Sequence, residues 1–279
     1  MVAPKQLKDE VDMLNIEWML VYILLGLFVG FMVGLLGVGG GGILVPLLVS
    51  IFSYQGVSAD NVVHLALGTS LACMIMSSIA SIRAHAAQGT VVWKVVYGMA
   101  PGIMVGAFSI TRITANVNSA YIAAFFALFM ALVAGQMFLN WRPKASQKSA
   151  KFRGLFLAGT GIGSVSALAA VGGGFLTITY LSYNNVDMQK AIGTSSAIGF
   201  PIAIAGTVGY MMSGWSQTLN VPYTLGFIYV PAFLVISIVS SIAARYGARC
   251  SHRLPETYLK KIFAVIALVL SVKMLFSVV

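Results

Sequence analysis

Ten apolar segments follow one another along the chain, separated by short polar links. Two of them, at about residues 43–53 and 175–183, are shorter than the roughly 20 helical residues that cross a hydrocarbon core of about 30 Å. The other segments lie at about residues 18–36, 62–82, 92–112, 118–140, 154–170, 190–213, 222–244 and 257–277. Backbone groups in lipid need internal hydrogen bonds, which favours helices. The pattern therefore predicts an all-α polytopic membrane protein that contains two half-helices.

One part of this pattern occurs twice. The segment GLFVGFMVGLLGVGGGGILVP at residues 26–46 returns as GTGIGSVSALAAVGGGFLTIT at residues 159–179, so Gly26 matches Gly159 with an offset of 133 residues. In both copies a run of glycines interrupts the apolar sequence just before a short segment. Such runs cannot sustain a helix. Broken helices at corresponding positions of two halves are typical of binding sites near the midplane of transporters.

Each copy contains five apolar segments, and this odd number turns the second copy upside down in the membrane. We therefore expect two inverted-topology repeats, residues 1–140 and 154–279, joined by a basic cytoplasmic linker at residues 141–153. Three further basic links then share the cytoplasmic side, at residues 83–94, 184–190 and 245–261. The four links hold 13 of the 17 lysines and arginines, as the positive-inside rule requires. Both termini are predicted on the non-cytoplasmic side.

The composition agrees with a membrane protein. Hydrophobic residues make up 59% of the chain and charged residues only 9%, against about 25% in soluble domains. The net charge of +10 comes mainly from the basic links, so it reports topology and not a nucleic-acid partner. Cys73 and Cys250 have no metal or redox spacing, and we expect no metal site and no cofactor. The acidic first residues do not resemble a cleavable signal, so the first segment should remain as a span.

Other glycines favour helix packing. Two sets recur at every fourth position, which lets neighbouring helices approach closely. The first set is Gly26, Gly30 and Gly34, and the second is Gly98, Gly102 and Gly106.

A new helix is expected to start after each glycine break, at about Ile43 and Phe175. The first N–H groups of a helix have no partner within it and lie at the positive end of its dipole. Two such ends, brought together by inverted symmetry, would form an anion site near the midplane. The candidate binding residues are Gly39, Gly40, Gly41, Gly42 and Ile43 in the first copy and Gly172, Gly173, Gly174 and Phe175 in the second.

A second pair of matching segments, ALGTS at residues 66–70 and AIGTSSA at residues 191–197, aligns Thr69 and Ser70 with Thr194 and Ser195. Hydroxyl groups can donate hydrogen bonds to an oxyanion without adding charge, and a neighbouring glycine lets a ligand reach the backbone. The alternative is that these hydroxyls bond carbonyls of their own helix or bridge two helices. Recurrence beside the glycine breaks favours the binding role.

The charged residues narrow the ligand class. All seven acidic residues lie in tails or links, so no predicted span contains a carboxylate. A cation transporter normally places carboxylates in the interior of its bundle, so the ligand should be negative or neutral. Arg83, His85 and His64 lie at the ends of the third segment and are candidates for a proton or ligand role; the alternative is interfacial anchoring.

The glycine-rich and G-T-S motifs together resemble the TauE/SafE family of prokaryotic membrane transporters. The motifs that carry the resemblance are GVGGGGILVPLL at residues 37–48, ALGTS at 66–70, AVGGGFLTI at 170–178 and AIGTSSA at 191–197. It covers nearly the whole chain. The resemblance implies movement of a sulfur-containing oxyanion, such as sulfite, sulfoacetate or another organosulfonate, across the cytoplasmic (inner) membrane, with protons as a candidate coupling ion.

We therefore expect a secondary transporter that works by alternating access, with the lipid bilayer and a small anion as its partners. An anion channel, or a transporter for a different small anion, is the alternative. An enzyme is not expected, because no segment holds a Cys/His or paired-carboxylate constellation. The sequence is compatible with an oligomer.

Overall fold

The computed structural model describes residues 15–36, 40–139, 152–215, 221–251 and 256–278. These residues form ten helices, and no β-strand occurs among them. In chain order the helices are α2 (Ile16–Leu36), α3 (Gly41–Tyr54), α4 (Ala59–Ala87), α5 (Trp93–Thr114), α6 (Ser119–Leu139), α7 (Phe152–Leu168), α8 (Gly174–Tyr183), α9 (Met188–Gly214), α10 (Val230–Ser251) and α11 (Glu256–Val278). Their bounds confirm the predicted apolar segments to within a few residues, with one exception.

The exception is the start of α10. The apolar pattern predicts a segment from residue 222, but residues 221–229 fold into a compact turn instead. Tyr223 and Gly226 have φ angles of 58° and 57°, and Thr224 forms an isolated bridge with Tyr229. Pro231 agrees with the late start of the helix, because a proline has no N–H to bond to a carbonyl of a preceding turn and is tolerated in the first turn of a helix.

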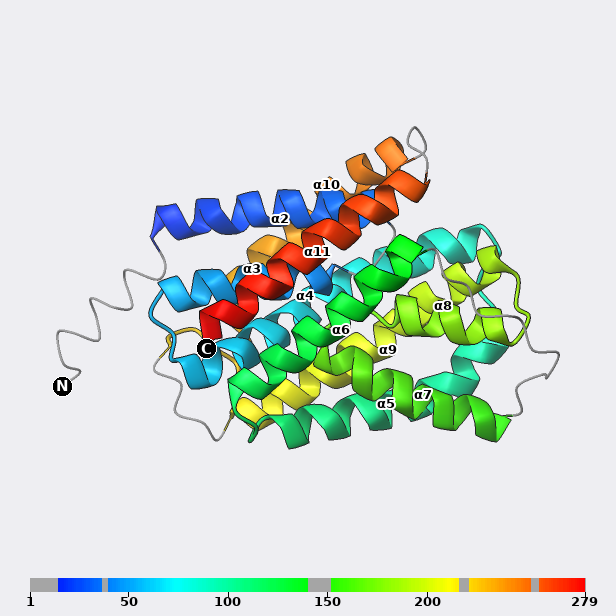
Figure 1. Ribbon diagram of the computed structural model, residues 1–279, viewed down its shortest axis with the longest axis horizontal. Helices are drawn as coiled ribbons and strands as arrows, with labels where there is room; N and C mark the ends of the chain where they lie inside the picture. Colours follow the sequence, from blue (N-terminus) through cyan, green and yellow to red (C-terminus); the bar gives the residue numbers. More distant parts are fainter. Residues whose placement is uncertain (1–14, 37–39, 140–151, 216–220, 252–255, 279) are drawn as a thin grey trace.

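The helices lie side by side and their ends gather at two opposite ends of the molecule (Figure 1). At the end drawn on the left, α2 begins, α11 ends, and the pairs α3/α4, α5/α6 and α9/α10 are connected. At the other end the chain passes from α4 to α5, α6 to α7, α8 to α9 and α10 to α11. Each short helix therefore returns toward the end at which the preceding helix began, as predicted. The described helix ends that border the four links predicted to be basic also share one end.

Glycines determine the closest helix contacts, as predicted. A Cβ on Gly30 or Gly34 of α2 would overlap the backbone of α10, at Ser240 or Ala244. In the same way, a Cβ on Gly102 or Gly106 of α5 would overlap the carbonyl groups of Phe156 or Thr160 in α7. Residue numbers rise together in both pairs, so α2 runs parallel to α10 and α5 runs parallel to α7.

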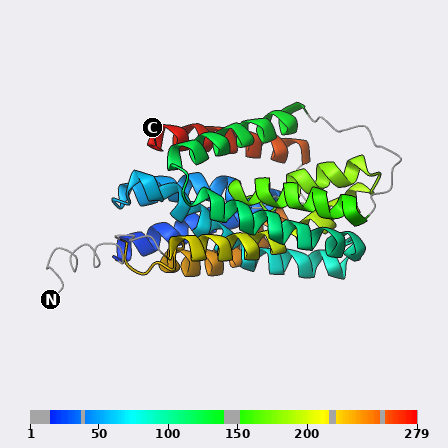
Figure 2. The same ribbon diagram turned by 90° about the horizontal axis from the view of Figure 1, so that it is seen from below.

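Among the described residues, six helices are long and apolar enough to cross a membrane: α2, α4, α5, α6, α9 and α10. The most buried of these are α4 and α9, which pack against each other. Large apolar side chains such as Leu24, Leu132 and Ile242 are exposed, as expected for surfaces that face lipid. Helices α6 and α11 pack together and form a layer along one face of the molecule (Figure 2).

Candidate functional site

The two glycine breaks meet in the structure. The first break precedes α3, and the second lies between the end of α7 at Leu168 and the start of α8 at Gly174. A Cβ on Gly41 would overlap the carbonyl oxygen of Ala170, so only glycine permits this approach of the two chain segments. Segments that are 129 residues apart, counted from 41 to 170, therefore form one locus. Gly39, the first residue of the predicted site, lies outside the described residues.

Two backbone carbonyl groups lie at the start of α3. Gly40 O accepts hydrogen bonds from the N–H groups of Ile43 at 3.2 Å and Leu44 at 2.9 Å. The Ala170 carbonyl, which faces Gly41, adds a negative partial charge at the positive end of this helix. Gly42 and Ile43 are buried. The arrangement explains how the dipole of α3 is stabilised within the protein itself.

The start of α8 is different. Gly173 takes a left-handed conformation with a φ of 68°, which turns the chain into the helix, and its carbonyl accepts the N–H of Thr177 at 2.8 Å. The N–H groups of Gly174, Phe175 and Leu176 have no acceptor among the described residues. A Cβ on Gly174 would meet no atom within 4 Å. Gly172 lies against α9, where its carbonyl oxygen would stand 3.1 Å from a Cβ on Gly199.

The G-T-S segments make matching contacts in the two halves. Thr69 Oγ1 in α4 accepts the N–H of Tyr229 at 3.0 Å, and Thr194 Oγ1 in α9 accepts the N–H of Val92 at 2.9 Å. Tyr229 and Val92 each stand immediately before a helix, α10 and α5 respectively. Both threonines therefore anchor the first turn of a helix, which is the bridging role that the sequence left as the alternative. Their predicted role toward a ligand remains a prediction.

The glycines beside these threonines serve the same contacts. A Cβ on Gly68 would overlap the carbonyl of Phe227, and one on Gly193 would overlap the side chain of Thr90. The space beside each glycine is thus taken by a neighbouring chain segment. The serines differ from each other: Ser195 donates to the carbonyl of Ile192 at 2.8 Å, whereas Ser70 Oγ is buried without a partner among the described residues.

The remaining candidates lie at the two ends of α4 and do not join one site. His64 is about 30 Å along the helix from Arg83 and His85, from the rise of about 1.5 Å per residue. Arg83 is exposed, and His85 is partly buried with its Nδ1 3.2 Å from Thr90 Oγ1. His64 is buried, with Nε2 2.9 Å from the carbonyl of Thr114 and Nδ1 3.2 Å from Ser119 Oγ. These bonds join α4 to the end of α5 and the start of α6.

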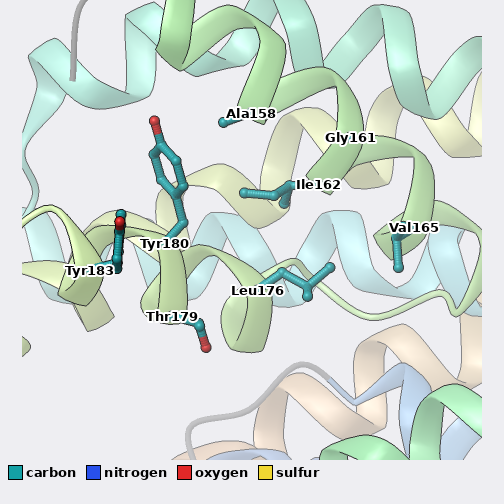
Figure 3. Close-up of a pocket in the computed structure, with 8 residues that line it drawn as sticks. All are labelled: Ala158, Gly161, Ile162, Val165, Leu176, Thr179, Tyr180 and Tyr183. Carbon is teal, nitrogen blue, oxygen red and sulfur yellow. The ribbon is translucent and has the colours of Figure 1, made fainter. Parts of the chain in front are cut away.

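A groove of about 520 Å³ separates α7 from α8 (Figure 3). Its lining is almost entirely apolar, and Tyr180 and Tyr183 stand along one side. The hydroxyl of Thr179, also in the lining, donates to the carbonyl of Phe175 at 2.9 Å. An apolar groove of this kind suits an apolar partner and not an anion.

Sequence comparison of the two copies missed one polar residue near the second break. Thr177, in the first turns of α8, is fully buried, and its Oγ1 has no hydrogen-bond partner among the described residues. The offset of 133 places Leu44 at the same position in the first copy. A search for hydroxyl residues within one turn of either half-helix start would have found it.

Comparison with known proteins decides the family. A family model described as "Sulfite exporter TauE/SafE" matches residues 22–274. The chain belongs to the TauE/SafE family. It is 32% identical over 258 residues to a probable membrane transporter protein of Haemophilus influenzae, covering 92% of this chain and 98% of the relative. It is 27% identical over 257 residues to the probable membrane transporter protein YdhB of Bacillus subtilis, covering 86% and 92% of the two chains.

A probable membrane transporter protein of the archaeon Methanocaldococcus jannaschii is also similar, with 27% identity over 256 residues that cover 88% of this chain and 92% of the relative. No solved structure gives a significant match. The resemblance drawn from the glycine-rich and G-T-S motifs is thus confirmed. As a TauE/SafE protein, the chain is a multi-pass membrane protein of a transporter family and not an enzyme. Its partners are the lipid bilayer and a small substrate.

Proposed function

We propose that this TauE/SafE protein is a secondary transporter for a small sulfur-containing oxyanion, such as sulfite, sulfoacetate or another organosulfonate. It would operate by alternating access between two inverted repeats, α2–α6 and α7–α11, in the cytoplasmic membrane of a prokaryote. The observation that carries the proposal is the contact between Gly41 and Ala170, which brings two interrupted helices to one locus. Helix ends at such a locus offer uncharged N–H donors to an anion.

The pairing of helices supports the inverted repeats. In an inverted repeat, α2 corresponds to α7, α4 to α9 and α5 to α10. The contact between α2 and α10 then has its counterpart in the contact between α7 and α5, and the contact between α4 and α10 in that between α9 and α5. All four contacts occur. The pairs α4·α9 and α6·α11 convert into themselves, as pairs on a two-fold axis must. Val92 and Tyr229, the residues whose N–H groups bond to the two threonines, are 137 positions apart. The same offset relates Met137 in α6 to Met274 in α11, so these two residues occupy corresponding positions.

One departure from this symmetry supports alternating access. Helix α11 packs against α3, but α6 makes no comparable contact with α8 in the described part of the chain. The groove between α7 and α8 is consequently open, as Figure 3 shows. If the repeats exchange conformations, α6 packs against α8 and α11 leaves α3. Two such states related by symmetry are the basis of alternating access in transporters built from inverted repeats.

The basic helix ends support an orientation. Arg83, Lys94, Lys190 and Arg245 lie near the end at which α4, α8 and α10 finish. By the positive-inside rule we assign this end to the cytoplasm, which places the start of α2 and the end of α11 on the other side. Protons are the coupling ion to test first, because the carboxylates of the described spans, Glu17 and Asp60, lie in the first turns of α2 and α4, and none lies deeper where it would bind a metal cation.

Counterflow in proteoliposomes tests the proposal. Vesicles that contain the purified protein and a high concentration of unlabelled sulfite are diluted into a trace of labelled sulfite. A carrier should concentrate the label transiently above its external level, because exchange precedes the loss of the internal pool. Vesicles loaded with chloride, and vesicles without protein, serve as controls.

Each result has a clear meaning. Transient accumulation that also occurs with an organosulfonate supports a carrier for sulfur oxyanions. Rapid equilibration without accumulation identifies an anion channel, which the same helix dipoles could serve. Permeation of neither sulfite nor sulfonates contradicts the proposed substrate class.

A further inference from the structure

The hydroxyl of Thr177 needs a partner that the protein does not supply. The side chain is 0% exposed, and among the described residues nothing bonds to Oγ1. This oxygen lies 3.4 Å from the position that a Cβ would take on Gly173, so it points back toward the start of α8. A buried hydroxyl without a partner is unfavourable and uncommon in folded proteins. A bound ligand at the start of α8 would satisfy it.

Free backbone donors lie at the same place. Gly174 and Phe175 begin α8, and their N–H groups have no acceptor in the described part of the chain. The position beside Gly174 is open, with no atom within 4 Å of a Cβ placed there. At the start of α3, by contrast, the carbonyl of Ala170 already faces the helix. The N–H groups of Gly41 and Gly42 also have no acceptor in the described part of the chain, but the first turn of α3 holds no hydroxyl residue. Of the two half-helices, only α8 therefore has both free N–H groups beside an open position and a hydroxyl directed at them.

Among the described residues, the nearest neighbours of this end are uncharged. The atoms closest to Gly173 belong to Ile202 and Ile198 of α9 and to Thr177 itself, and α8 has no ionisable side chain apart from its tyrosines. Lys190 is exposed and lies near the opposite end of α8. A site built from neutral donors in a low dielectric favours a single negative charge, because the Born cost of desolvation rises with the square of the charge, about fourfold for a dianion.

We propose that the start of α8 binds a singly charged oxyanion, such as a sulfonate or hydrogen sulfite, through the N–H groups of Gly174 and Phe175 and the hydroxyl of Thr177. This inference rests on the proposed function and makes it specific: repeat two holds the anion, and the ligand is a monoanion. The start of α3, where Gly41 faces the carbonyl of Ala170, does not bind the ligand. Thr177 is then a specificity-determining residue.

Binding to the full chain in lipid nanodiscs tests the inference, measured by titration calorimetry with methanesulfonate, sulfate and chloride at matched ionic strength. Thr177→Val keeps the shape of the side chain and removes the hydroxyl. Losing a hydrogen bond to a charged ligand should weaken methanesulfonate binding about 10- to 100-fold. Thr177→Ser keeps the hydroxyl and should stay within about threefold of the wild type. Thr111→Val is the matched control, since Thr111 is equally buried but donates to the carbonyls of Ala107 and Phe108.

Melting without ligand separates binding from folding. Thr177→Val should melt at or above the wild-type temperature, because it removes an unpaired buried hydroxyl. Wild-type affinity in Thr177→Val overturns the site at α8 but leaves the proposed function standing if counterflow persists. Tighter binding of sulfate than of methanesulfonate by the wild type overturns the monoanion assignment, whatever the variants do. If the wild type binds neither anion and shows no counterflow, the proposed function fails together with the site.

Discussion

Gly41→Ala tests whether the two breaks are held in direct contact. The added Cβ would overlap the carbonyl oxygen of Ala170 and lie 2.6 Å from its carbonyl carbon. Carbon atoms in contact are normally about 3.5–4.0 Å apart, so the two segments must separate by about 1 Å. The obstacle is backbone, which cannot rotate away as a side chain could.

The expected cost follows from this overlap. Overpacking a well-packed interior by one methyl group costs about 1–3 kcal/mol. At about 2–4 °C per kcal/mol for a chain of this size, the melting temperature should fall by about 2–12 °C. Sulfite counterflow should also slow, because the same separation displaces the start of α8.

Melting in detergent, followed by intrinsic fluorescence, measures the change. Gly135→Ala is the matched control: Gly135 lies within α6, and a Cβ there would meet no atom within 4 Å. That variant should melt at or slightly above the wild-type temperature, since alanine favours a helix by up to about 1 kcal/mol over glycine. If Gly41→Ala melts and transports like the wild type, the contact between the breaks is refuted, and with it the main support for a shared site.

Two further predictions concern the frame around the site. Thr69→Val leaves the buried N–H of Tyr229 without its Thr69 acceptor, and Thr194→Val does the same to the partly buried N–H of Val92. Each variant should lower the unfolding free energy by about 1–3 kcal/mol, measured by denaturant titration. Thr160→Val, whose hydroxyl bonds only its own helix at Phe156, should cost less, and equal costs would contradict the anchoring role. Cross-linking tests the exchange of the two packings, in a chain whose Cys73 and Cys250 are replaced by alanine. Cysteines introduced at Met137 in α6 and Tyr180 in α8 should cross-link only during sulfite turnover, whereas the equivalent pair at Met274 and Leu47 should cross-link at rest. The same cross-linking yield with and without sulfite would argue against the exchange.

Segment lengths and glycine positions were sufficient to predict most of the fold. Glycines within apolar segments, such as Gly41 and those of α2 and α5, allow two backbones to approach closely in a membrane. Their contacts could therefore be predicted from the sequence directly. The turn at 221–229 was not predictable from hydropathy, because Phe227, Ile228 and Tyr229 are as apolar as a span. Their backbone instead packs against α4, which lies about 160 positions earlier in the chain.

The candidate site was predicted less completely for a related reason. A G-T-S segment looks the same whether its hydroxyl meets a ligand or a distant N–H group, and the partner of Thr194 is 102 residues away in the sequence. Thr177 was missed because the prediction weighted residues shared by both copies, and the first copy has Leu44 there. The two half-helices are distinguished by a position at which the copies differ, and a comparison of shared residues does not find such a position.

The contacts also indicate which parts of the molecule can move. Close backbone contacts at glycine join α2 to α10 and α5 to α7, and the threonine anchors join α4 to the start of α10 and α9 to the start of α5. Sliding any of these pairs would bring Cα atoms into carbonyl groups or leave a buried N–H unpaired. Helix α6 has no such restraint at Gly135, which faces open space, and it packs mainly on α11. We therefore expect α6 and α11 to shift as a pair over a fixed frame of the other helices, from α3 toward the groove beside α8.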